Sequence, residues 1–169
     1  MRSETDLAVD VVERSPLWRE RVADLDPLCA ATARAALAAS GGEDRGACEL
    51  SIVLADDALL RALNAKWRGI DKPTNVLAFA AEDAETPPGA PRLLGDVVIA
   101  FETMAREALA QVKPLDHHLR HLIVHGVLHL LGWDHEDPAE AERMEALEVV
   151  ILQRLDVPDP YRMSEASHG

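Results

Sequence analysis

The chain has 169 residues, and its 48% hydrophobic and 28% charged residues are the balance of one globular domain rather than of a disordered chain. The net charge of −13 argues against a protein that coats nucleic acid through its overall field, although it leaves room for a local cationic groove. Two cysteines are too few for a disulfide scaffold, and neither an apolar signal segment nor a membrane-spanning run is present. We therefore expect a cytoplasmic protein with reduced thiols.

Strands and helices are expected to alternate along the chain up to residue 111. Alternating apolar runs predict strands, an alanine-rich segment before two glycines predicts a helix, and Asp56 has the position of a helix N-cap. Three prolines predict a loop at 85–92. The expected elements are, in order, a strand at 7–13, a helix at 27–39, a strand at 48–55, a helix at 56–68, strands at 75–80 and 93–100, and a helix at 101–111.

Two further helices complete the expected architecture. A long helix at 114–131 should end at Gly132, which can adopt the left-handed conformation that reverses the chain. A last helix should begin at Asp137, a capping residue followed by a proline. Because strands and helices are interleaved, we predict an α+β fold with a mixed four-stranded sheet packed with helices, in which the third and fourth strands can form a hairpin.

The segment HGVLHLLGWDH holds three histidines within eleven residues. His125 and His129 are four residues apart, so they share one helix face and can bind one metal ion, and His135 can return to it after the turn. Three imidazoles leave one position of a tetrahedral zinc open for solvent, as in catalytic sites. Nickel, copper or iron(II) would suit the same ligands. The alternative, three hydrogen-bonded core histidines, explains the spacing less well.

The pattern lacks the glutamate that zinc proteases carry directly after the first histidine as general base. Gly126 occupies that position, which argues against peptide hydrolysis by the usual route. Asp134 could replace the glutamate, although an aspartate beside a ligand is more often an orienting or turn group. We expect His121 either to line the site or to pack between helices. Solvated surface positions are expected for His117, His118 and His168.

Four segments between about Leu50 and Tyr161 carry a combined pattern that is specific. They are LNAKWRGIDKPTNVLAF, LGDVVIA, HLIVHGVLHLLGWDH and EDPAEAERMEALEVVILQRLDVPDPY. Together they resemble the bacterial YbeY family, rRNA maturation factors regarded as metal-dependent single-strand endoribonucleases. Asn75 and Ala78 depart from the family's commonest form, which has aspartate and serine there.

The resemblance implies a single zincin-like domain over residues 1–169, with the metal site on a central helix. It implies His125, His129 and His135 as the ligands of one zinc ion per chain, and Arg68 as the cationic catalytic residue. The implied function is a single-strand-specific endoribonuclease in 16S rRNA 3′-end maturation and ribosome quality control. On the residues alone, Arg68 would be a surface cation or an ion-pair partner of Asp71.

The remaining expectations concern how RNA is bound. Trp67 and Trp133 could stack on unpaired bases, but core or turn packing is the expected role for both. The strand at 93–100 could form one wall of a cleft or could be a plain core strand. With few basic residues, affinity for single-stranded rRNA should be weak and salt-sensitive. We therefore expect ribosomal small-subunit proteins and an assembly GTPase as partners, and no membrane.

Two other functions remain open at this point. One is a non-catalytic, zinc-stabilised ribosome-assembly factor, and the other is a metallopeptidase with an unusual base.

Overall fold

The computed structural model describes residues 7–40, 46–82 and 87–162. The predicted strands and helices are confirmed to within two residues of their bounds; part of the proline loop lies outside the described residues. The elements are β1 (Leu7–Glu13), α1 (Leu17–Arg21), α2 (Leu25–Ala39), β2 (Cys48–Ala55), α3 (Asp57–Arg68), β3 (Val76–Ala80), β4 (Arg92–Ala100), α4 (Phe101–Ala110), α5 (Leu115–Leu130), α6 (Pro138–Arg154) and the 3₁₀ turn η3 (Pro160–Arg162).

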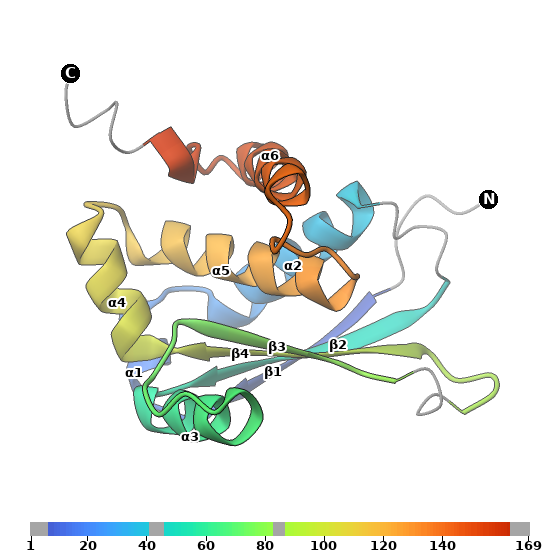
Figure 1. Cartoon of the computed structure of the whole chain (residues 1–169), viewed down its shortest axis with the longest axis horizontal. Coiled ribbons are helices and arrows are strands. Elements are labelled where there is room, and N and C mark those ends of the chain that lie inside the picture. Colours follow the sequence, from blue (N-terminus) through green and yellow to red (C-terminus); the bar gives the residue numbers. More distant parts are fainter. Residues whose placement is uncertain (1–6, 41–45, 83–86, 163–169) are drawn as a thin grey trace.

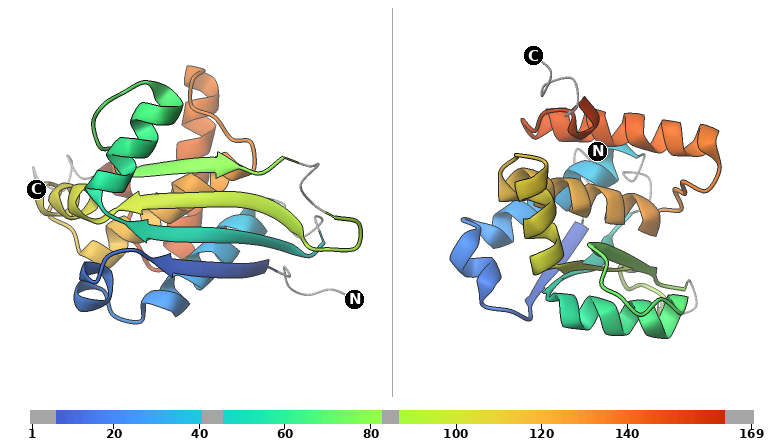
Figure 2. Two further views of the ribbon diagram at one scale, coloured as in Figure 1. Left: turned by 90° about the horizontal axis from the view of Figure 1, so that it is seen from below. Right: turned by 60° about the vertical axis from the view of Figure 1, so that its left-hand side comes forward.

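A four-stranded mixed sheet in the order β1-β2-β4-β3 organises the molecule (Figures 1 and 2). β1, β2 and β4 run parallel, whereas β3 pairs antiparallel with β4 in the predicted hairpin. The fold class predicted from the sequence is confirmed. Of the two possibilities for the strand at 93–100, the plain core strand is the one observed, because β4 lies inside the sheet between β2 and β3.

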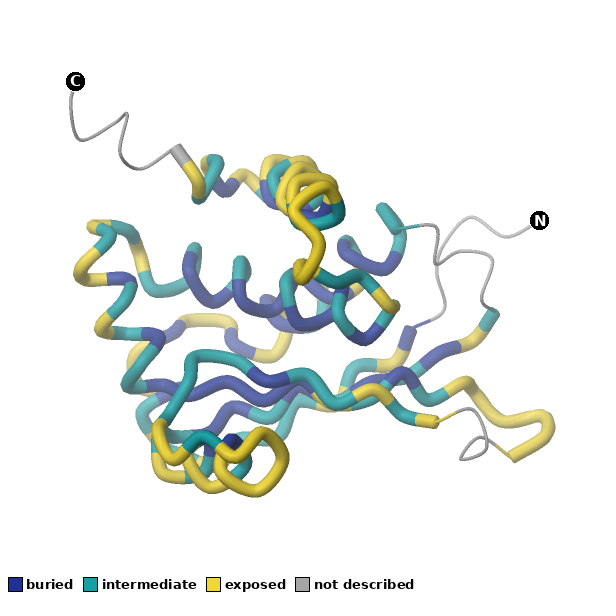
Figure 3. The backbone as a smooth tube through the Cα atoms, in the orientation of Figure 1, coloured by how far each residue is buried: buried dark blue, intermediate teal, exposed yellow. Residues whose placement is uncertain are grey.

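Helices cover both faces of the sheet (Figure 1). α2 and α5 lie on one face with α6 stacked beyond them, and α3 lies on the other face. The larger core fills the space between the sheet and the first group of helices, and a smaller core lies under α3. Figure 3 shows that α5 is largely covered, while the outward side of α6 and much of α3 are exposed. The helix that carries the histidines is therefore held on several sides.

Helix α1 was not predicted from the sequence, because its five residues are too few to show a periodicity. Tertiary contacts hold it instead. The Trp18 indole is fully buried, donates a 2.9 Å hydrogen bond to the backbone oxygen of Ala55, and packs edge-to-face on Phe101. A single large side chain thus fixes the segment between β1 and α2.

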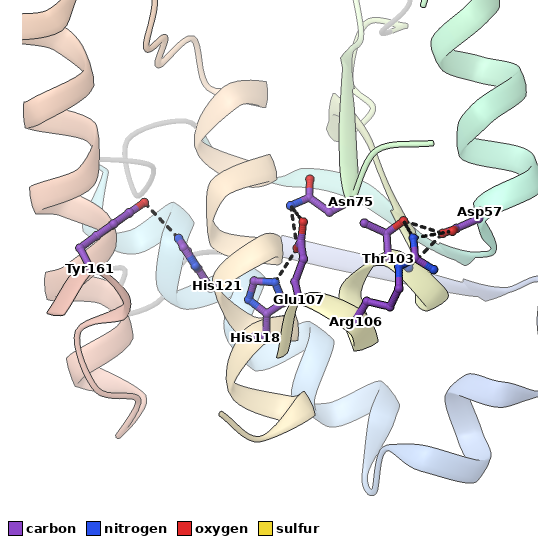
Figure 4. A network of polar contacts seen from close by, with 8 residues as sticks. All are labelled: Asp57, Asn75, Thr103, Arg106, Glu107, His118, His121 and Tyr161. Atoms are coloured by element: carbon purple, nitrogen blue, oxygen red, sulfur yellow. Dashed lines mark hydrogen bonds and ion pairs between the residues drawn. The ribbon is translucent and has the colours of Figure 1, made fainter. Parts of the chain in front are cut away.

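Helices α3 and α4 cap each other at their N-termini, and Figure 4 shows the contact between Asp57 and Thr103. The Glu102 carboxylate accepts a 2.8 Å hydrogen bond from the backbone N–H of Asp57, and the Asp57 carboxylate accepts bonds from the backbone and hydroxyl of Thr103. These bonds satisfy N–H groups that a helix leaves without internal partners. The reciprocal cap fixes α3, which ends at Arg68, against α4, which carries Glu107.

Candidate metal centre and adjoining cleft

Three histidine side chains converge where α5 ends. His125 and His129 lie one turn apart on α5, and Gly132, with φ of 100°, turns the chain so that His135 returns to them. One ring nitrogen of each histidine lies within 4.8 Å of the other two. The Nε2 atoms of His125 and His129 are 3.1 Å apart. The spacing argument from the sequence therefore corresponds to the geometry of the described chain.

The three imidazoles fit a divalent metal ion. Zinc–nitrogen bonds of about 2.0–2.1 Å at tetrahedral angles place two ligand nitrogens roughly 3.3 Å apart, close to the observed separation. His125 and His129 are partly buried and His135 is exposed, so the centre faces solvent. Among the described residues, no fourth histidine, cysteine or carboxylate joins the cluster. The arrangement is that of a three-ligand site with room for solvent or substrate.

A buried carboxylate that the sequence analysis did not identify stands behind the histidines. Glu148 on α6 is fully buried, and its oxygens accept hydrogen bonds from His125 Nδ1 at 2.7 Å and His121 Nε2 at 3.0 Å, and another from the Tyr161 hydroxyl. Burial raises the pKa of Glu148, but these hydrogen bonds outweigh it and bring the pKa to about 2. The ionised carboxylate fixes His125 with Nδ1 as donor, which leaves Nε2 free as a ligand.

A signal for Glu148 was present in the sequence. The residue lies on the buried stripe of α6 that also holds Met144 and Ile151, where a charged side chain needs a partner. His121 contacts this carboxylate across the interface between α5 and α6 and also lines the cleft. It therefore combines the two expected roles, packing between helices and lining the site. Figure 4 shows Tyr161, from the turn after α6, beside the His121 ring.

Burial also acts on the pKa of a ligand histidine. It lowers the pKa of His129, and the neighbouring His125 and His135 lower it further. The neutral imidazole is the form that a metal ion requires.

A cleft of about 1010 Å³ opens beside the histidines. Edge strand β3 and helix α5 supply much of its lining. Arg68, Trp133 and the three histidines line it, and so does a second group of polar residues that includes Glu107 and Lys113. The cleft therefore brings candidate metal ligands, a guanidinium and further polar side chains to one surface.

Arg68 is the last residue of α3 and is exposed at the cleft. The alternative ion pair with Asp71 is not formed, because the Asp71 carboxylate binds Arg61 at 2.8 Å. The hydrogen bond from Arg61, together with its charge, lowers the pKa of Asp71. Within the described residues Arg68 has no ion-pair partner, so its guanidinium is available to an anion.

The structure explains why Gly126 replaces the glutamate of zinc proteases. A Cβ at Gly126 would lie 2.6 Å from Val97 Cγ1, because α5 packs closely against β4 here. The Cβ of any other residue at position 126 would overlap the Val97 side chain on β4. Asp134 lines the cleft beside the histidines, and its carboxylate accepts a 3.2 Å hydrogen bond from the backbone N–H of Glu136 within the turn.

The other histidines and the tryptophans depart in part from the expectations. His118 was expected at the surface but is only 3% exposed, because its ring packs beside Glu107 and donates to that carboxylate. His117 is partly buried, and His168 lies outside the described residues. Core or turn packing was expected for Trp67; its side chain is 61% exposed, and its ring contacts Phe79 and the Lys66 ammonium. Trp133 is partly buried, as packing requires.

Comparison with known proteins identifies the family. The family model for Endoribonuclease YbeY matches residues 22–156. A protein of Paramagnetospirillum magneticum named Endoribonuclease YbeY is 54% identical over 92% of this chain and 95% of its own length. One from Bradyrhizobium sp. with the same name is 59% identical over 76% of this chain and 79% of its own length. The chain belongs to the endoribonuclease YbeY family.

The family assignment makes the protein a hydrolase that acts on RNA. A solution structure of the protein TM1509 from Thermotoga maritima has the same fold, with a TM-score of 0.55 and 17% identity over 88% of this chain and 92% of that one. In the described part of the chain, no helix is both long and apolar enough to cross a membrane.

Asn75, one of the two departures that the family resemblance singled out, has a defined partner in this chain. Its Nδ2 atom donates to Glu107 at 3.0 Å, and the same carboxylate oxygen accepts from His118 Nε2 at 2.8 Å. An aspartate at position 75 would set a second carboxylate against Glu107 in place of a donor. Ala78, the other departure, lies on β3 and lines the cleft without a hydroxyl.

Proposed function

We propose that this protein is a zinc-dependent endoribonuclease that cuts single-stranded RNA in the cleft between β3 and α5. His125, His129 and His135 hold one zinc ion, and Arg68 binds the scissile phosphate. The observation that carries this proposal is the convergence of three ring nitrogens within 4.8 Å of one another, in a cleft that Arg68 also lines.

The residues divide the chemistry among them. Bound zinc would supply a Lewis acid that stabilises charge on a phosphate oxygen and activates the nucleophile. The Arg68 guanidinium stays charged at any working pH, and its planar fork of donors matches two phosphate oxygens. It can therefore orient the phosphate and stabilise the charge that develops during cleavage. Glu148 holds His125 in the orientation that ligation requires.

The biological setting follows from the family and from the charge. We propose that the substrate is the 3′ end of 16S rRNA and that the protein serves in ribosome quality control in the cytoplasm, as a single domain over residues 1–169. A net charge of −13 supports delivery of the substrate by partners, namely ribosomal small-subunit proteins and an assembly GTPase.

The test compares cleavage and zinc content in matched variants. Arg68→Ala should keep its zinc and lose roughly 10²- to 10³-fold in the cleavage rate of single-stranded RNA, because a transition-state contact is removed. His129→Ala should lose both zinc and cleavage. Arg154→Ala changes an exposed arginine on α6, outside the cleft, and should match the wild type.

Unchanged cleavage in both cleft variants would attribute the activity to a contaminating nuclease and reject the proposal. Failure of His129→Ala to fold, together with no RNA cleavage by the zinc-loaded wild type, would favour zinc as a structural element of a non-catalytic assembly factor. A metallopeptidase is disfavoured by the contact between Gly126 and Val97, which leaves no space for the usual glutamate.

A further inference from the structure

A second polar cluster lines the cleft and is separate from the histidine ligands. It consists of Asn75 before β3, Glu107 on α4 and His118 near the start of α5 (Figure 4). Glu107 Oε1 accepts hydrogen bonds from His118 Nε2 at 2.8 Å and from Asn75 Nδ2 at 3.0 Å. Three separate elements thus converge on one carboxylate.

The Glu107 carboxylate keeps hydrogen-bonding capacity toward the cleft. Its side chain is 33% exposed, and among the described residues its second oxygen has only the longer 3.3 Å contact with Asn75. Burial raises the pKa of Glu107, but the hydrogen bonds from His118 and Asn75 outweigh it and leave the pKa below its ordinary value. The group is therefore an ionised acceptor held in one orientation.

The cluster is costly to maintain. Because His118 donates through Nε2 and burial lowers its pKa, its Nδ1 is an unprotonated acceptor, and this atom is buried without a partner among the described residues. An ionised carboxylate in an RNA cleft also repels phosphates. The second cost is explained if Glu107 accepts hydrogen bonds from a part of RNA other than its phosphate.

We propose that Glu107, oriented by Asn75 and His118, forms a base-reading subsite that binds the donor edge of guanine beside the scissile phosphate. The inference rests on the proposed function, since it assumes that RNA enters this cleft. His118 and His125 are seven residues apart on α5, about 10 Å along the helix axis. The subsite therefore reads a nucleotide neighbouring the one whose phosphate meets the histidines.

Guanine is the base that fits this chemistry. Its Watson–Crick edge presents N1–H and N2–H together, which can donate to a carboxylate as a pair, and single-stranded RNA leaves that edge free to be read. Inosine lacks the N2 amino group, and uracil offers one N–H between two acceptors that would face the carboxylate. A carboxylate at this position selects the base, whereas Arg68 holds the backbone.

The experiment measures binding to metal-free protein, so that it does not depend on cleavage. Fluorescence anisotropy compares labelled uridine hexamers that carry one central guanosine, one central inosine or no substitution. We expect the guanosine hexamer to bind about tenfold more tightly than the uridine hexamer, with inosine between them. Glu107→Gln should remove the preference for guanosine. Its affinity for the uridine hexamer should stay within about twofold of the wild-type value or rise slightly above it. Glu142→Gln, an exposed carboxylate change on α6, should keep the preference.

Equal affinity of wild-type protein for the three hexamers would overturn the proposal, and so would a guanosine preference that survives in Glu107→Gln. The wild-type comparison decides the matter even if the variant unfolds. A guanosine preference without cleavage activity would support this inference and reject the proposed nuclease function. Cleavage without any base preference would support the nuclease function and reject the guanine subsite.

Discussion

At the scale of single residues, Glu148 orients His125 in the candidate metal centre without belonging to the histidine cluster. Glu148→Ala should lower zinc affinity by about 10- to 100-fold, because His125 loses the acceptor that sets its orientation. Glu148→Gln should lose less, since an amide oxygen can still accept from Nδ1. Zinc affinity is measured by competition with a chromophoric chelator.

Tyr161→Phe serves as the matched control for this prediction. It removes one donor to Glu148 and leaves both histidine contacts in place, so its effect on zinc affinity should be the smallest of the three. Equal zinc affinity in Glu148→Ala and wild type would show that the ligand imidazoles orient themselves without the carboxylate.

His118 should make the stability of the protein depend on pH. Burial lowers its pKa below the ordinary value of 6.5, and the hydrogen bond to Glu107 offsets this only in part. The unfolded chain then binds a proton more readily than the folded one, so this contribution is complete above that value and is lost as pH falls.

We therefore expect the free energy of unfolding to fall between about pH 7 and pH 5, and to fall less steeply in His118→Gln. Urea unfolding across this range measures the slope. His117→Gln, a change in the preceding residue, should keep the wild-type slope. A steeper slope in His118→Gln than in wild type would contradict the assignment.

The sequence predicts the clustered histidines better than the residues that orient them. His125, His129 and His135 are visible because helix spacing and one glycine turn place them together. Glu148 and His118 depend on contacts between elements distant in the chain. The periodicity of α6 does not indicate that Glu148 will face α5. The sequence around His118 does not predict its contact with the Glu107 carboxylate.

At the scale of elements, the close approach of α5 to β4 limits what Gly126 can become. Gly126→Ala should lower the free energy of unfolding by about 1–3 kcal/mol, because its Cβ would overlap the Val97 side chain. Adding Val97→Ala should recover part of that loss, since the smaller side chain makes room. Urea unfolding of both single variants and the double variant measures the coupling. Strictly additive losses would mean that the two positions do not share this contact.

Local signals explain which elements could be predicted. Asp56 and Asp137 both accept the backbone hydrogen bond expected of an N-cap, and Gly132 ends the turn after α5 with a positive φ. Strand order carries no such local signal. The placement of β4 inside the sheet follows from its parallel pairing with β2 as well as its hairpin with β3, and only the first of these joins distant segments.

At the scale of the whole molecule, an acidic protein presents few cations to its substrate. Arg68 and Lys113 are the lysines and arginines that line the cleft within the described chain. Two phosphate contacts predict a slope of about −1.4 for the logarithm of RNA affinity against the logarithm of salt concentration. Anisotropy titrations of a uridine hexamer at several salt concentrations measure it.

Arg68→Ala should reduce the magnitude of that slope by about 0.7, whereas Arg154→Ala should leave it unchanged. A wild-type slope steeper than about −3 would place additional cations on the RNA path and contradict the cleft as its main contact.

The position of Glu148 has a consequence for how activity is acquired during synthesis. All three candidate ligand histidines leave the ribosome before Glu148, which orients His125, and Tyr161, which donates to Glu148, because those two residues belong to α6 and the turn after it. A chain that lacks α6 can carry all three histidines and still bind the proposed zinc ion weakly. RNA cleavage, which would be harmful if it began too early, therefore depends on the docking of α6, the last helix to be synthesised.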